Sequence, residues 1–107
     1  MSLDFSLIND EGEVLFWFNI THNLGCMADK AGLYKVLWVP DENGYIYAKD
    51  IVEVLINGHL KLILVPEYFE WFTPSNNWGN VGVLINVVKD TLKACEKYPN
   101  SKNVVSK

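Results

Sequence analysis

Near its N-terminus the chain reads Leu3-Asp4-Phe5-Ser6-Leu7-Ile8, then Asn9-Asp10-Glu11-Gly12, then Glu13-Val14-Leu15-Phe16-Trp17-Phe18-Asn19-Ile20. The two flanking segments are rich in aromatic and aliphatic residues typical of β-strands, and the four residues between them favour a tight reversal of the chain. The region therefore predicts a β-hairpin. Because two strands alone are marginally stable in water, helices are expected to cover the apolar face of this hairpin.

The sequence after the hairpin predicts five helices. The first is capped by Thr21 or Asn23 and ends near Ala31, because Gly32 readily takes a left-handed conformation. Residues 41–44 are expected to form a loop. The other four helices are each begun or ended at a proline, and we expect them at about residues 33–38, 47–65, 67–72 and 81–98.

Three of these predictions concern packing. Gly58 is expected to weaken the 47–65 helix, and the segment 67–72 is apolar nearly all round, which predicts burial. Cys26 and Cys95 are expected to be small core residues. In the last helix, residues at helical spacing predict the stripe that faces the core: Val81, Ile85, Val88, Leu92 and Cys95.

A chain of 107 residues, half of them apolar, is expected to form one domain. The predicted fold class is α+β, with the N-terminal hairpin packed against about four or five helices, the last of them the longest. We expect residues 1–98 to form a single compact domain and residues 99–107 to be a polar C-terminal tail.

Composition argues against several classes of function. The net charge is −4, with thirteen acidic residues against nine basic ones, and all nine are lysine, which disfavours nucleic-acid binding. No apolar run is long enough to span a bilayer. With two cysteines and no secretory segment, a reducing cytoplasm is the expected compartment. No metal-ligand or cofactor motif occurs, so neither a metal nor a cofactor is expected.

Two polar clusters form the predicted binding site. The first follows the apolar second strand and contains Asn19, Thr21, His22 and Asn23. The second, which contains Asn76, Asn77 and Trp78, opens the last helix and is expected to face the first. Thr21 and Asn23 are also preferred helix caps, and an alternative interpretation of the second cluster makes Asn77 a cap and Trp78 a core residue.

These clusters favour non-enzymatic binding of a small polar molecule, plausibly nucleotide-like. A second hypothesis is an enzyme in which His22 acts as general base, although no paired carboxylates or nucleophile motif accompany it. A third is a protein-interaction module that uses an aromatic surface around Trp71 and Phe72. No membrane partner is expected, and self-association remains open.

A set of short motifs extends along most of the chain: Asn19-Ile20-Thr21-His22-Asn23-Leu24, Met27-Ala28, Ala31-Gly32-Leu33-Tyr34, Leu37-Trp38, Pro40, Pro74 and Asn77-Trp78-Gly79. These motifs resemble those of a family of short uncharacterised proteins of bacteriophages and prophages. The resemblance spans roughly residues 13–99, although the family often has a basic residue where this chain has Val39. It implies a small phage-associated protein, and it suggests sequestration of a host signalling molecule as one role.

Overall fold

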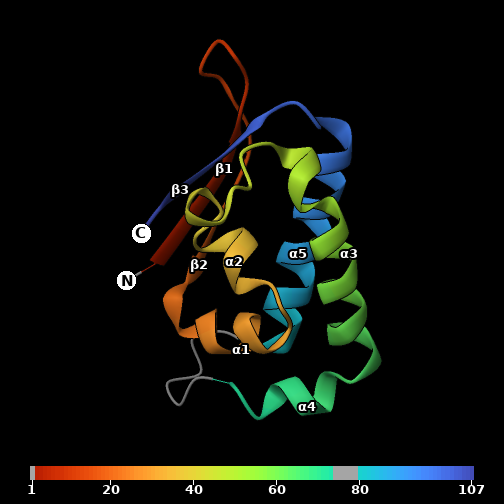
Figure 1. Cartoon of the computed structure of the whole chain (residues 1–107). Helices are drawn as coiled ribbons and strands as arrows, with labels where there is room; N and C mark the ends of the chain where they lie inside the picture. The colour runs from red at the N-terminus through yellow and green to blue at the C-terminus, as the bar shows by residue number, and fades with distance from the viewer. Residues whose placement is uncertain (1, 74–79) are drawn as a thin grey trace.

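The computed structural model describes residues 2–73 and 80–107, which form an α+β fold with a three-stranded antiparallel sheet on one side and helices on the other (Figure 1). The strands are β1 (Ser2–Ile8), β2 (Val14–Thr21) and β3 (Lys102–Ser106), in the order β2-β1-β3. The predicted hairpin of β1 and β2 is present. The predicted contacts of Asn76, Asn77 and Trp78 lie outside the described residues.

The hairpin turn is held by the side chain of Asn9. Its Oδ1 accepts the backbone N–H groups of Glu11 and Glu13, at 3.0 and 2.9 Å. Gly12 has a φ of 82°, in the left-handed region that glycine adopts without strain. The turn chemistry anticipated from the sequence therefore fixes the start of β2 opposite the end of β1.

The predicted C-terminal tail is wrong in its central part, because residues 102–106 form β3. This strand pairs with β1, so that Val105 lies opposite Phe5. Asn103 ties it to the segment before the long third helix: its backbone N–H donates to Ile46 at 2.9 Å, and its side-chain amide donates to the carbonyls of Tyr45 and Tyr47. The chain beyond residue 98 thus completes the sheet.

The α-helices follow the predicted order, but residues 41–43, which were expected to lie in a loop, form a short 3-10 helix. Gly32 has a φ of 77° and ends the first helix, as expected, and Pro66 begins α4. None of the helices in the described ranges is long and apolar enough to cross a membrane. Their bounds are η1 His22–Leu24, α1 Gly25–Lys30, α2 Tyr34–Leu37, η2 Asp41–Asn43, α3 Ala48–Leu64, α4 Pro66–Glu70 and α5 Val81–Lys97.

The core lies between the inner face of the sheet and the pair of long helices, α3 and α5 (Figure 1). Alternation along β1 places Phe5 inward and Ser6 outward, and Phe5 stacks on Phe18 of β2 with ring centroids 5.2 Å apart. Fully buried side chains from the sheet and the helices meet here, among them Leu3, Leu7, Leu24, Met27, Leu33, Leu37, Ile51, Leu55, Leu62 and Leu84.

The buried face of α5 differs in part from the predicted stripe. Val81, Val88 and Cys95 are buried as expected, but Leu84 is fully buried whereas Ile85 is only partly buried. Adjacent aliphatic residues cannot be ranked by spacing, and α5 contacts both α3 and β2, which widens its buried face. Leu92 is likewise only partly buried whereas Thr91 is fully buried, so the core stripe is displaced by one residue at positions 84 and 91.

Gly58 does not interrupt α3; it lets α3 approach the α1–α2 connection. A Cβ at this position would overlap the side chain of Leu33, with its Cγ only 2.5 Å away, and Leu33 is fully buried. The glycine is thus a packing requirement, and its weak helix propensity is tolerated for that reason.

The variant Gly58→Ala is expected to lower the free energy of unfolding by about 1–3 kcal/mol, since overpacking of Leu33 outweighs the better helix propensity of alanine. Urea denaturation measures this change. The double variant Gly58→Ala/Leu33→Ala should lose less free energy of unfolding than the sum of the losses in the two single variants. A stabilised Gly58→Ala protein would show that the close approach is absent.

Candidate functional site

Asn19 lies on the outer face of the sheet, in register with Asp4 of β1. Its amide nitrogen donates to Oδ1 of Asp4 at 2.8 Å and to Oγ of Ser2 at 2.9 Å. Both N–H groups of the amide are thus used within the sheet, and the side chain is exposed. Asn19 therefore offers an external ligand only its carbonyl oxygen.

Thr21 caps the first helical turn, which the sequence allowed as one of two capping residues. Its Oγ1 accepts the backbone N–H of Asn23 at 3.2 Å. The side chain of Asn23 is exposed beside it. This arrangement accounts for Thr21 structurally and leaves Asn23 open to solvent.

His22 is fixed by a hydrogen bond from a core tryptophan. The indole Nε1–H of Trp38 donates to Nδ1 of His22 at 3.0 Å, and Trp38 is only 2% exposed. The ring of Tyr34 stacks on Trp38 with centroids 5.5 Å apart and an angle of 11° between the planes. Gly25 packs beside this stack, and a Cβ there would make only ordinary contact, 3.6 Å from the Tyr34 ring.

The bond from Trp38 determines the protonation geometry of His22. An Nδ1 that accepts a hydrogen bond carries no proton, so the neutral ring carries its proton on Nε2. A general base needs a free lone pair, and the lone pair of Nδ1 is occupied by the indole. The described contacts of His22 therefore favour a structural role and give no support to a general-base role.

Substitutions of Asn19, near the end of β2, and of His22, just after it, are expected to differ in their effect on stability. His22→Ala leaves the buried indole N–H of Trp38 without its partner and should cost about 1–3 kcal/mol, whereas Asn19→Ala removes exposed bonds and should cost about 1 kcal/mol or less. Thermal and urea denaturation measure both values. In a Trp38→Phe background, His22→Ala should lower the free energy of unfolding by less. An unchanged loss would contradict the hydrogen bond between Trp38 and His22.

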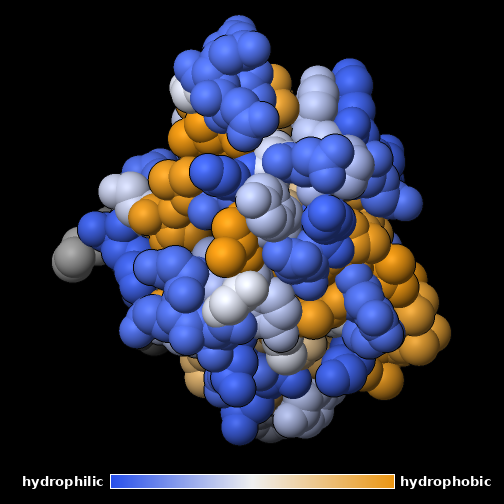
Figure 2. Space-filling model, turned by 45° about the horizontal axis from the view of Figure 1, so that its top comes forward, coloured by the Kyte–Doolittle hydropathy of each residue, from blue (hydrophilic) through white to orange (hydrophobic). Residues whose placement is uncertain are grey.

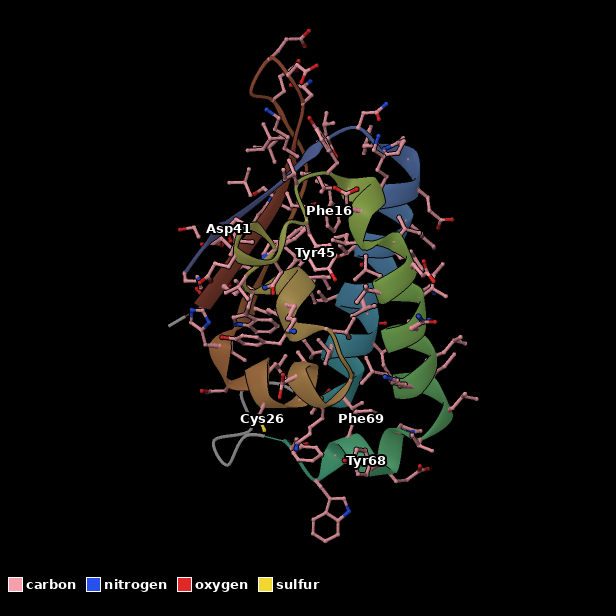
Figure 3. The ribbon with its side chains drawn as sticks, viewed as in Figure 1. Phe16, Cys26, Asp41, Tyr45, Tyr68 and Phe69 are labelled. Carbon is pink, nitrogen blue, oxygen red and sulfur yellow. The ribbon has the colours of Figure 1, made fainter. Side chains whose placement is uncertain are left out.

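The two cysteines differ, which corrects the expectation that both belong to the core. Cys95 is buried in α5, and burial, with a smaller contribution from Glu96, raises the pKa of its thiol to about 12, so it stays protonated at neutral pH. Cys26 is exposed and projects from α1 near the α4 end of the molecule (Figure 3). No group of three potential metal ligands gathers within the described residues.

A cleft of about 280 Å³ lies at the hairpin-turn end of the sheet, away from the corner formed by the end of β2. This volume is just below the usual range for small-molecule pockets. The residues that line the cleft include none of the predicted site residues: Asn9, Asp10, Leu15, Lys97, Tyr98, Pro99, Asn100 and Ser101.

An exposed apolar surface runs over α3 and α4, and its α4 end includes Trp71 of the hypothesised aromatic surface, whereas Phe72 is partly buried against the core. The segment 67–72 was expected to be buried, but only Phe69 is, while Tyr68 is 51% and Trp71 86% exposed. Figure 2 shows apolar residues gathered along the flank on which α3 lies. We call this the α3–α4 surface; it consists of Ile56, Leu60, Ile63, Leu64, Val65, Tyr68 and Trp71.

The sequence does contain the signal for this surface. Ile56, Leu60 and Leu64 are spaced four apart, which places them on one side of α3, while the core uses a different side that includes Leu55 and Leu62. The helix is thus apolar on two sides. A single search for helical spacing merges the two stripes into one.

Comparison of the chain with protein-family models, with curated proteins and with solved structures found no match. Function is therefore inferred from the geometry of the chain itself.

Proposed function

We propose that the protein is a non-catalytic binding module that recognises another polypeptide through the α3–α4 surface. The observation that carries this proposal is the 86% exposure of Trp71 at the end of that surface. Single exposed apolar side chains are common on soluble proteins, but a run of them that ends in an exposed tryptophan is typical of interaction sites. Tryptophan is also enriched among the residues that dominate binding energy.

Charge beside Trp71 indicates the chemistry of the partner. Glu67 and Glu70 line an open hollow together with Trp71. A lysine or arginine that enters this hollow can bond the carboxylates while it lies against the indole ring. The net charge of −4 also favours the approach of a basic molecule. The proposed partner is therefore a polypeptide that presents a basic residue beside apolar side chains.

Selection from a random peptide library tests this proposal. Peptides that bind the wild-type protein should contain lysine or arginine next to apolar residues. In solution, Trp71→Ala should weaken binding of a selected peptide about thirtyfold or more, the loss expected for a residue that dominates an interface. Fluorescence anisotropy of the labelled peptide measures this affinity.

Matched control variants distinguish binding at the α3–α4 surface from effects of losing any exposed tryptophan or any carboxylate. Trp17→Ala removes another exposed tryptophan, 61% exposed on β2, and should leave the affinity unchanged. Glu70→Gln should weaken binding, whereas Glu96→Gln on α5 should not. Enrichment of acidic peptides, or equal affinity for wild-type and Trp71→Ala proteins, would overturn the proposal.

A second candidate is the small polar molecule expected from the sequence, bound at Asn19, His22 and Asn23. The bond from Trp38 favours it, because it leaves the Nε2–H of His22 as an oriented donor. A nucleotide panel assayed by thermal shift tests it, since a ligand at a hundred times its Kd adds about 2.7 kcal/mol of stability. His22→Gln should abolish the shift. No shift with any nucleotide would exclude this candidate.

The motif resemblance supports a further part of the proposal, namely that this is a phage or prophage protein. Two free cysteines agree with action in the reducing cytoplasm of a host. In that setting, a host protein with a basic, apolar segment is the expected partner of the α3–α4 surface.

A further inference from the structure

The two edge strands of the sheet, β2 and β3, differ in whether another segment of the chain pairs with their outer side. The outer edge of β3 is covered at its start by residues 45–47, through the bond from the Asn103 N–H to Ile46 and the bridge between Tyr47 and Lys102. Within residues 2–73 and 80–107, no backbone hydrogen bond joins β2 to any strand or loop on the side away from β1. Among the described residues, the edge of β3 is thus closed at Lys102 and Asn103, whereas the edge of β2 is open along its whole length.

Strand β2 has one feature that can protect an open edge, the irregularity at Leu15 where the register with β1 shifts, but it lacks the others. It contains no charged residue, no proline and no glycine, and it is the longest strand of the sheet. Trp17 on its outer face is 61% exposed, and Val14 is 54% exposed. Phe16 and Phe18 point to the inner face but are only partly buried. An added strand would cover both faces at once.

From these observations we infer that the protein forms a two-fold symmetric dimer in which the β2 strands of two copies pair antiparallel, giving a continuous six-stranded sheet. Paired residues must lie on the same face, so the two-fold axis passes through a residue position. With the axis at Trp17, the two Trp17 side chains meet on the outer face. On the inner face, Phe16 of each protomer lies opposite Phe18 of its partner.

Charge favours the antiparallel arrangement. The hairpin turn beside β2 carries Asp10, Glu11 and Glu13. A parallel pair would place these acidic turns side by side, whereas the antiparallel pair with its axis at Trp17 separates the two Glu13 positions by about 27 Å. Each acidic turn then lies opposite the Thr21 end of the partner's β2, a strand that contains no charged residue. Because β2 itself contains no charged residue, two copies can pair along it without placing like charges opposite each other, so the proposed occupant is a second copy of the chain.

Sedimentation equilibrium of the full chain tests the dimer. The wild-type protein should show a concentration-dependent monomer–dimer equilibrium, and Trp17→Lys should raise its Kd about a hundredfold or more, because it places two like charges at the axis. Val104→Lys is the matched control, since Val104 lies on the same outer face, two strands away, and is 44% exposed. It should leave the Kd unchanged.

Cross-linking tests the register without depending on that variant. In a Cys26→Ser background, Trp17→Cys should form a disulfide-linked dimer under mild oxidation, because cross-strand Cβ atoms lie at about the separation that a disulfide needs. Val104→Cys should not. A wild-type chain that stays monomeric at its solubility limit, or a dimer dissociated by Val104→Lys but not by Trp17→Lys, would overturn the inference.

Discussion

Replacing Phe5 with alanine is expected to lower the free energy of unfolding by about 3–5 kcal/mol. Phe5 is fully buried in the central strand, stacks on Phe18 with the two rings 9° from parallel, and lies opposite Val105 of β3. A loss of this size is a large part of the stability of a small domain. Urea denaturation measures it.

The neighbouring residue provides the control for this variant. Ser6 points to the outer face of β1, so Ser6→Ala should change stability by about 0.5 kcal/mol or less. Similar losses for Phe5→Ala and Ser6→Ala would mean that the inner and outer faces of the sheet are assigned wrongly.

The second large effect is expected for Leu84→Ala in α5, which should lower the free energy of unfolding by about 2–5 kcal/mol because this side chain is fully buried. Ile85→Ala should cost less, since Ile85 is partly buried, and Lys93→Ala should cost about 0.5 kcal/mol or less. The same denaturation series measures all three. A greater loss for Ile85→Ala than for Leu84→Ala would restore the face predicted from spacing alone.

Elements determined by neighbouring residues were predictable from the sequence. The hairpin follows from the Asn9–Gly12 turn, and the helix limits follow from Gly32 and Pro66. Strand β3 was missed because its partner β1 lies at the other end of the chain, and the short segment 102–106 has no local turn to mark it. Long-range pairing of this kind leaves little trace in local composition.

The same distinction applies to the candidate site. The Thr21 cap is local and was anticipated, whereas the bond between His22 and Trp38 joins residues sixteen positions apart and needed the structure. Exposure of Trp71 contradicted the burial predicted for its segment, because apolarity gives no information about whether the core has room. Departures from local expectation of this kind often mark functional surfaces.

The indole N–H signals in a two-dimensional NMR spectrum test the proposed function most directly. The chain contains four tryptophans, and single variants assign their four signals. On addition of a selected basic, apolar peptide, the Trp71 signal should shift progressively while the Trp38 signal, held by His22, stays in place. A spectrum in which the Trp38 signal shifts and the Trp71 signal does not would contradict binding at the α3–α4 surface and would place the peptide near His22.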